Sequence, residues 1–158
     1  MKMHFKLAYA AVLTSMLTLT GCSSFKPETQ DCTKQVTVPP VGSNMVILSE
    51  AGQEVAVRLN GITAQCHDKN DGTVINVDVG LKVTRNLEQN SDAQYLRVPF
   101  ITAIIDGDDK VVDHSSFGYR MAFGKNIGEI YPLTDFKLTI PKGGRLILSL
   151  ITEEIELK

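Results

Sequence analysis

His114-Ser115-Ser116 is the segment whose residue types most suggest hydrolytic chemistry. A serine nucleophile needs a base such as histidine within hydrogen-bonding distance. Adjacent residues on a strand point to opposite faces, however, and the sequence lacks a Gly-x-Ser-x-Gly turn that would present a serine. We therefore interpret His114 as a solvent-facing strand residue and predict that the protein is not an enzyme.

Two acidic clusters could gather around a cation. One is Asp68, Asn70 and Asp71 before Gly72, and the other is Asp106-Gly107-Asp108-Asp109. An EF-hand loop has its glycine at the sixth place and a glutamate at the twelfth, whereas Gly72 falls fifth from Asp68. We interpret both clusters as hairpin tips, with a calcium loop as the alternative for each. No metal ion or other cofactor is predicted.

Residues 1–21 have the features of a cleavable signal peptide. Lys2 and Lys6 give a positive start, and residues 7–20 form a stretch of 14 residues without a charge. At 1.5 Å per residue this stretch is too short to cross a hydrocarbon core, which needs about 20 residues. The segment is therefore expected to be removed and to lie outside the fold.

The tetrapeptide Leu19-Thr20-Gly21-Cys22 closes that segment and resembles the lipobox of bacterial lipoproteins. The resemblance implies that signal peptidase recognises Leu19, Thr20 and Gly21, that diacylglycerol is attached to the Cys22 sulfur, and that the new amino terminus is acylated. Stable membrane anchoring requires more than one acyl chain, and this modification would supply three. The alternative is a secreted protein in which Cys22 pairs with another cysteine.

Ser23 bears on the choice of membrane. Gram-negative lipoproteins with Asp at this place are commonly retained in the inner membrane, so Ser23 implies a lipid anchor in the cell outer membrane, facing the periplasm. Removing residues 1–21 from the 158 leaves 137, with 14 basic and 18 acidic residues and a formal charge of −4. That charge attracts neither anionic lipid nor nucleic acid. We predict membrane attachment through the lipid and no nucleic-acid partner.

Cys32 and Cys66 are the two cysteines left once Cys22 is acylated. In an oxidising envelope compartment an even pair is most simply a disulfide. It would stabilise the fold by roughly 3–4 kcal/mol in the chain-entropy model and would staple the N-terminal segment to the body. The alternative is a redox or metal-binding thiol pair. The chain has no Cys-x-x-Cys, however, and His67 adds at most one ligand where zinc takes four.

Most of the remaining chain alternates apolar and polar residues, the pattern of half-buried strands. The alternation is clearest at residues 75–83 and recurs at 117–123, 136–140 and 146–150, with turn-forming residues between the runs. No long stretch has a sustained helical period. We predict an all-β fold, a single antiparallel immunoglobulin-like β-sandwich of about seven strands after a signal helix and tether.

This interpretation divides the chain into three parts. Residues 1–21 are the signal peptide, residues 22–44 the lipidated N-terminus and tether, and residues 45–158 the β-sandwich domain. The apolar residues at 55–59 and 62–66 have opposite parity, so Asn60-Gly61 is either a tight hairpin turn or a bulge in one long strand. We favour the bulge because the strand at 73–85 needs a long neighbour.

A second resemblance covers most of residues 32–151. The matching features are Cys32, Cys66, Asn70-Asp71-Gly72, a Pro-aromatic strand at 98–106, Ile140-Pro141 and a closing strand at 146–150. Together they resemble a family of uncharacterised bacterial envelope lipoproteins. The sequence departs from that pattern at Leu150-Ile151, where the family leads us to expect Gly-Phe. The resemblance implies the compartment and the sandwich, and it brings no activity.

Two predicted strands are apolar on both faces. Opposite their core-facing residues lie Ile101, Ala103 and Ile105 on one strand, and Ile147 and Ile151 on or after the last. A sheet in a two-layer sandwich buries only one face in the core, so something must cover this second set. The cover is either the tether or a loop, or another envelope protein docked there. Pro99 cannot donate to a ladder, which suggests a sheet edge or a bulge.

Two functional hypotheses follow. The first is a non-enzymatic structural, assembly or interaction component of the bacterial envelope, with an envelope protein as its partner. The second is a periplasmic module that binds a small ligand or glycan, with an exposed aromatic such as Tyr95 or Tyr131 beside a concave site. An enzyme is the weakest alternative, because no nucleophile with a matching base is apparent.

Overall fold

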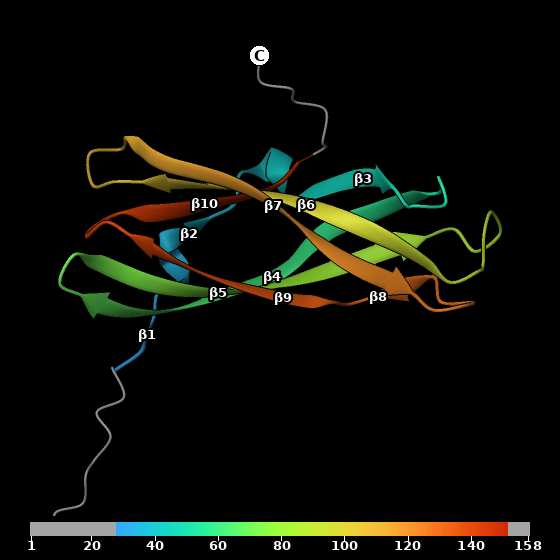
Figure 1. Cartoon of the computed structure of the whole chain (residues 1–158), viewed down its shortest axis with the longest axis horizontal. Helices are drawn as coiled ribbons and strands as arrows, with labels where there is room; N and C mark the ends of the chain where they lie inside the picture. Colours follow the sequence, from blue (N-terminus) through green and yellow to red (C-terminus); the bar gives the residue numbers. More distant parts are fainter. Residues whose placement is uncertain (1–27, 152–158) are drawn as a thin grey trace, which may run out of the picture.

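A computed structural model describes residues 28–151, which form an all-β fold of two facing sheets (Figure 1). Sheet A consists of β1 (Gln30–Asp31), β3 (Asn44–Leu48), β4 (Glu54–Lys69), β5 (Gly72–Arg85), β8 (Glu129–Ile130) and β9 (Leu133–Ile140). Sheet B consists, in spatial order, of β2 (Val36–Thr37), β10 (Arg145–Leu150), β6 (Gln94–Ile105) and β7 (Val111–Phe123). Two short 3-10 turns, η1 (Thr33–Gln35) and η2 (Pro40–Gly42), flank β2.

The two-sheet arrangement confirms the predicted β-sandwich. Seven of the ten strands have five or more residues, in agreement with the expected number. Every pairing is antiparallel except β2 with β10, which is parallel. The immunoglobulin-like subtype stays a prediction.

The core follows from the alternation along each strand. On β5, the odd-numbered side chains from Ile75 to Val83 are buried, whereas Asp78 between them is exposed. Leu96, Val98 and Phe100 on β6 face them from the other sheet and are fully buried. Because side chains alternate between the two faces of a strand, the apolar residues at every second position all face the core.

β4 contains the bulge that the sequence left open. Leu59 is opposite Leu81 on β5, and the next pair is Gly61 with Gly80, so Asn60 has no partner across the ladder. The bulge confirms a single long strand and rejects the hairpin turn. Gly61 adopts a φ of +150°, which a side chain would disfavour. The extra residue returns Ala64 and Cys66 to the core face after the change of parity.

Pro99 lies on the part of β6 that β10 does not pair with, although β6 as a whole is an inner strand of sheet B. The Tyr95 carbonyl accepts a hydrogen bond from the Glu50 N–H (3.0 Å) on the side of β6 away from β7. The backbone polar groups of every second residue point to the same side of a strand, so those of Pro99 point to the same side as those of Tyr95. Proline has no N–H and cannot donate a hydrogen bond there. The pairing of β10 with β6 ends at Leu150 opposite Phe100, one residue before it would reach Pro99.

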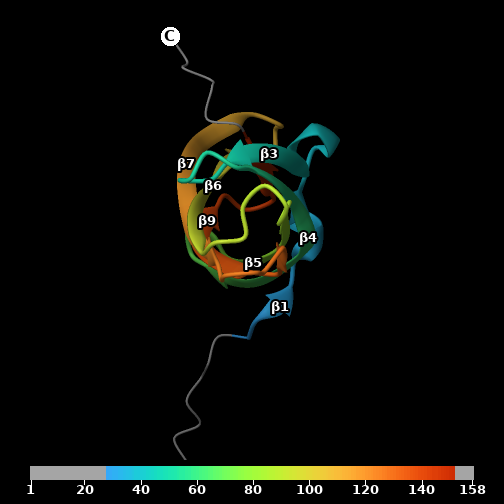
Figure 2. The same ribbon diagram turned by 90° about the vertical axis from the view of Figure 1, so that its right-hand side faces the viewer.

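The β5–β6 and β7–β8 loops lie at the end of the sandwich that faces the viewer in Figure 2, and the buried side chain of Arg85 joins them. The Arg85 guanidinium donates to the carbonyls of Ile127, Asp92, Ser91 and Gly124, at distances of 2.6–3.4 Å. These carbonyls belong to the β5–β6 and β7–β8 loops. Arg85 forms no ion pair with a carboxylate within residues 28–151, so carbonyl dipoles and the Phe123 ring compensate its charge.

Candidate functional site

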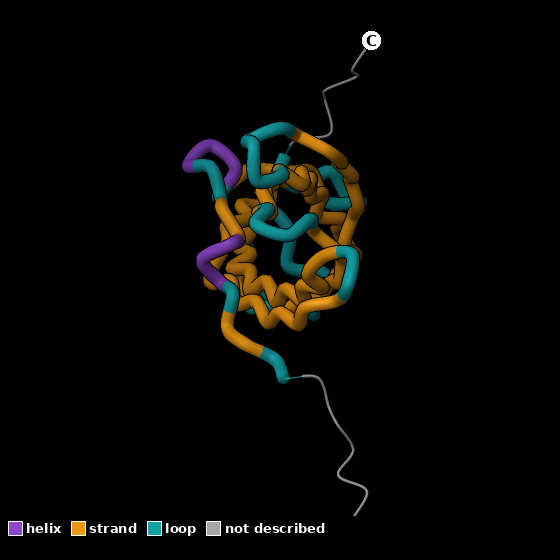
Figure 3. The backbone as a smooth tube through the Cα atoms, turned by 90° about the vertical axis from the view of Figure 1, so that its left-hand side faces the viewer, coloured by secondary structure: helices purple, strands orange, loops and turns teal. Residues whose placement is uncertain are grey.

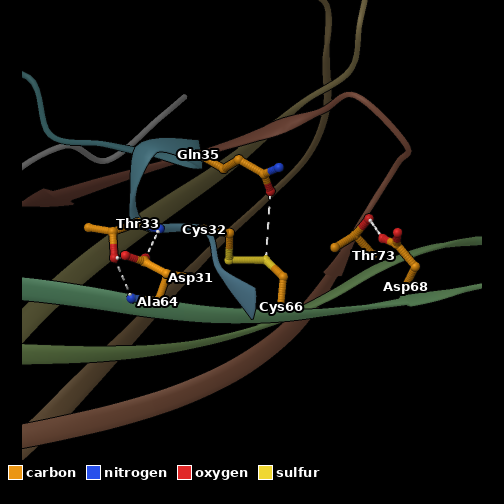
Figure 4. Close-up of a disulfide and its surroundings, with 8 residues drawn as sticks. All are labelled: Asp31, Cys32, Thr33, Gln35, Ala64, Cys66, Asp68 and Thr73. Carbon is orange, nitrogen blue, oxygen red and sulfur yellow. Dashed lines mark hydrogen bonds between the residues drawn. A yellow bond between two sulfur atoms is a disulfide. The ribbon is translucent and has the colours of Figure 1, made fainter. Parts of the chain in front are cut away.

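The two cysteines of the described chain form a disulfide, as predicted (Figure 4). The Cα atoms of Cys32 and Cys66 are 5.8 Å apart, and both residues are buried. Cys66 lies on β4, and Cys32 lies between β1 and η1. The Oε1 of Gln35 lies 3.7 Å from the Cys66 sulfur, a contact without a hydrogen bond because the disulfide sulfur carries no proton.

Polar side chains around the disulfide hold the N-terminal segment against β4. Asp31 accepts hydrogen bonds from both the backbone N–H and the hydroxyl of Thr33. Both bonds lower the pKa of the Asp31 carboxyl, and the bond from the backbone N–H has the larger effect. The Thr33 hydroxyl in turn accepts from the Ala64 N–H (3.0 Å). The burial of both cysteines and the hydrogen bonds around them are typical of a structural disulfide.

The predicted lipidation site and signal-peptidase site lie outside the described residues. These are Cys22 with Leu19, Thr20 and Gly21, and Ser23 lies there too. The described chain begins six residues after Cys22, and β1 follows almost at once. Within residues 28–151, no helix is long and apolar enough to span a bilayer.

The structure places His114 and Ser115 on opposite faces of β7. His114 and Ser116 lie on the outer face of β7, opposite Ala103 and Ile101, and both are exposed. Ser115 lies on the other face, where its hydroxyl is 2.9 Å from the Thr102 hydroxyl. His114 is therefore the solvent-facing strand residue that the sequence indicated.

Both acidic clusters lie at hairpin tips, as interpreted. Asn70 and Asp71 form the β4–β5 turn, and Asp68 accepts from the Thr73 hydroxyl (2.8 Å). In the β6–β7 turn, Asp106 accepts from two backbone N–H groups, and Asp109 pairs with Arg145 (2.6 Å). No cluster of three or more His, Cys, Asp or Glu side chains suited to a metal ion occurs in residues 28–151.

The proposed partner surface lies on the outer face of sheet B. Ile101 and Ala103 on β6 are half-buried there, and Ile147 is paired with Ala103 from β10. Ile105 is buried, at 6% exposed, and Ile151 is half-buried just after β10.

The N-terminal segment covers part of this outer face. A Cβ added at Gly42 of η2 would lie 2.0 Å from the Ser149 hydroxyl, and Ser149 shares the outer face with Ile147. The chain's own fold thus supplies some of the cover that the doubly apolar strands required.

Sequence reasoning missed a hollow on the outer face of sheet A. Val46, Ala56 and Thr84 form a cross-strand row over β3, β4 and β5, and the next row is Asn44, Arg58 and Lys82. Because Ala56 is smaller than its neighbours, the rows leave a hollow of about 360 Å³, bounded by these residues with Met45 and Val57. The hollow has an apolar floor and two cationic walls, Arg58 and Lys82. Only strand register could reveal it, because its residues are far apart in sequence.

Beside the hollow is a charged triad. Lys82 forms an ion pair with Glu129 (2.6 Å), the Tyr131 hydroxyl donates to the other Glu129 oxygen, and Lys82 lies 5.4 Å from the centre of the Tyr131 ring. The hydrogen bond from Lys82 has the largest effect in lowering the pKa of Glu129, and the bond from Tyr131 lowers it further. The same bond to Glu129 raises the pKa of Lys82. Tyr131 remains 59% exposed and can still receive a ligand on its ring.

Comparison with known proteins assigns no relative: no family profile, no curated protein and no solved structure matches this chain.

Proposed function

We propose that the protein is an envelope lipoprotein, anchored through Cys22 in the outer membrane and facing the periplasm, with a non-enzymatic structural, assembly or interaction role. The observation that carries the proposal is the Leu19-Thr20-Gly21-Cys22 tetrapeptide after an uncharged apolar stretch. The Cys32–Cys66 disulfide supports the compartment, because disulfides persist in oxidising spaces and are rare in the cytosol. Membership of the envelope lipoprotein family belongs to the same proposal.

Mass spectrometry of the protein extracted from membranes tests the anchor. The mature chain is expected to begin at Cys22 and to carry the mass of a diacylglycerol and an additional acyl chain. A Cys22→Ser variant is expected to lose the lipid and leave the membrane fraction, whereas a Ser24→Ala variant two residues away keeps both. An unmodified thiol at Cys22 of the wild-type protein would overturn the proposal.

The partner in this proposal is another envelope protein, docked on the half-buried outer face of sheet B around Ile101, Ala103 and Ile147. A photo-reactive residue at Ile101 or Ile147, irradiated in intact cells, is expected to yield one discrete crosslinked product. The same residue at Thr139, exposed on β9 of the other sheet, serves as the control. Identical product patterns from both faces would remove sheet B as the docking surface.

The hollow on sheet A favours a second candidate, a small-ligand or glycan module. Its apolar floor, its two cations and the nearby Tyr131 ring are groups that contact the face and the acidic substituents of a sugar. An acidic oligosaccharide is expected to raise the melting temperature of the wild-type protein. The same sugar should not stabilise an Ala56→Leu variant, in which the hollow is filled. Equal shifts in both proteins, or no shift in the wild type, would remove this candidate.

A further inference from the structure

Residues 28–43, which we call the strap, are fixed to sheet A at their start. β1 pairs with β4 at two positions, and the Cys32 N–H donates to the Ala64 carbonyl (3.0 Å). The Thr33 hydroxyl accepts from the Ala64 N–H, and the disulfide adds a covalent bond at the same place. All of these contacts lie within the first six residues of the strap.

Beyond Cys32 the strap passes through η1, β2 and η2, and β2 belongs to sheet B (Figure 3). β2 pairs with β10 at only two positions, and Val36 and Val38 are half-buried against the core. The strap ends at Ser43, after which β3 pairs with β4 over five residues. The part between the disulfide and β3 is therefore held by fewer strand pairs than β3 itself.

The order of these contacts decides where a pull from the N-terminal side is resisted. Such a pull reaches Cys32 before β2 or η2. With the disulfide formed, the pull passes through the sulfurs to Cys66 on β4, a strand that pairs with β1, β3 and β5. Without it, non-covalent contacts alone hold the strap. These are the short β1–β4 and β2–β10 pairings, the hydrogen bonds to Ala64, the packing of η2 on Ser149 and the bond from the Leu59 N–H to the Ser43 carbonyl (2.8 Å). The first long pairing that the pull meets is then β3 with β4.

The disulfide also sets the length of the tether. Ten residues separate Cys22 from Cys32, a span of about 35 Å at full extension. If the strap detached as far as Asn44, 22 residues would separate the lipid from the body, a span of about 75 Å. Detachment would also uncover the β10 edge and the part of the outer face that η2 occupies.

We propose that the Cys32–Cys66 disulfide transmits tension from the lipid tether into β4, and so keeps the strap closed and the domain within about 35 Å of its anchor. This inference rests on the proposed anchoring through Cys22. It assigns the disulfide a mechanical role in addition to its effect on folding stability.

Single-molecule pulling on the mature chain, residues 22–158, tests this role. One handle is placed at the N-terminus and the other at Thr139 on β9, so that β10 is outside the path of the force. The oxidised protein is expected to show no extension before the sandwich unfolds. A Cys32→Ala/Cys66→Ala variant, and wild-type protein reduced with a dithiol, are expected to lengthen first at low force by roughly 30–40 Å, as residues 33–43 detach.

A Thr33→Val variant is the control, because it removes the bond to Ala64 but keeps the disulfide, and it should show no early step. Hydrogen exchange without force gives a second measurement: residues 33–43 should lose protection in the reduced protein, while β5 keeps it. An early step in the oxidised protein, or none after reduction, would overturn the proposal. The measurement uses no lipid, so its result is separate from the mass test of Cys22.

Discussion

At the scale of single residues, the polar groups of this protein are mainly structural. Arg85 joins two loops through carbonyls and stacks on the Phe123 ring, 4.6 Å from its centre. Arg120 similarly stacks on Tyr95 and pairs with Glu50 (3.1 Å). Each of the two aromatics considered for ligand binding thus has a cation near one face of its ring, Arg120 at Tyr95 and Lys82 at Tyr131. Tyr131 is slightly the more exposed, at 59% against 51%.

Replacing Arg85 with Met should destabilise the protein strongly. The variant leaves up to four carbonyls without their donor, at the end of the sandwich, which we expect to cost roughly 2–4 kcal/mol. The midpoint of urea unfolding would report the loss. Arg97→Met, at an exposed position on β6, is the matched control and should change stability by no more than about 0.5 kcal/mol. Similar midpoints for the two variants would contradict the assigned role of Arg85.

Glu129 should contribute to acid sensitivity. Its pKa is lowered in the folded protein, so its contribution is present above its unfolded pKa and is lost as the pH falls through the folded value. Lys82, with a raised pKa, has the opposite dependence at alkaline pH. A Glu129→Gln variant should therefore show a flatter decline of stability in acid than the wild type. Glu54→Gln, on the same face of sheet A, should keep the wild-type decline.

At the scale of strands, bulges and edges decide which faces are available. The bulge at Asn60 keeps both halves of β4 on the core. β7 forms the edge of sheet B, and its His114 lies opposite Ala103 on β6. The backbone N–H and C=O of Ala103 point toward β10, so the N–H of His114 points away from β6 and out of the sheet. The Asp113 side chain accepts from that N–H (2.8 Å). The bond to this carboxylate uses the N–H of His114, which could otherwise pair with a strand of another molecule.

Gly61→Ala tests the bulge. A Cβ there would meet no atom within 4 Å, so any loss comes from the φ of +150° alone. We expect a cost of roughly 1–3 kcal/mol in unfolding free energy. Gly107→Ala, whose Cβ is also uncrowded and whose φ is not positive, is the control and should be nearly neutral. Equal stability of the two variants would mean that the bulge tolerates side chains.

Asp113→Val tests the protection of the β7 edge. The change frees the His114 N–H and extends the exposed pair Val111-Val112 to three valines, so we expect concentration-dependent self-association in sedimentation. Asp108→Val removes the same charge from the adjacent hairpin tip and should remain monomeric. If both variants associate equally, loss of charge and not the freed edge is the cause.

At the scale of the whole molecule, the two sheets share one core, and the chain passes between them several times. Phe117 of β7 stacks on Phe100 (5.3 Å) and contacts Phe136 of sheet A (5.2 Å). The strap is one of the crossings, since β1 belongs to sheet A and β2 to sheet B. The segment that the sequence presented as a tether is therefore, from residue 28 onward, part of the sandwich.

Loss of the disulfide should lower global stability. The cysteines are 34 residues apart, and closing such a loop restricts the unfolded chain by roughly 3–4 kcal/mol. Urea unfolding of the oxidised protein and of the Cys32→Ala/Cys66→Ala variant measures the difference. A Cys22→Ala variant leaves the bond intact and should match the oxidised protein. A difference below about 1 kcal/mol would mean that the bond does little for folding.

The sequence alone predicted the strands at residues 75–83 and 136–140 and the Cys32–Cys66 disulfide, and it favoured a bulge at Asn60-Gly61 without excluding a hairpin turn. Each depends on local alternation, on turn chemistry or on a count of cysteines, which can be read along one chain. The tertiary structure alone decided the parallel β2–β10 pairing, the carbonyl cage of Arg85, the hollow around Ala56 and the cover of η2 over Ser149. These depend on which strands become neighbours and in which register. Pairing between distant segments is set by the packing of the whole core, and period-two alternation is the same whichever neighbour a strand takes.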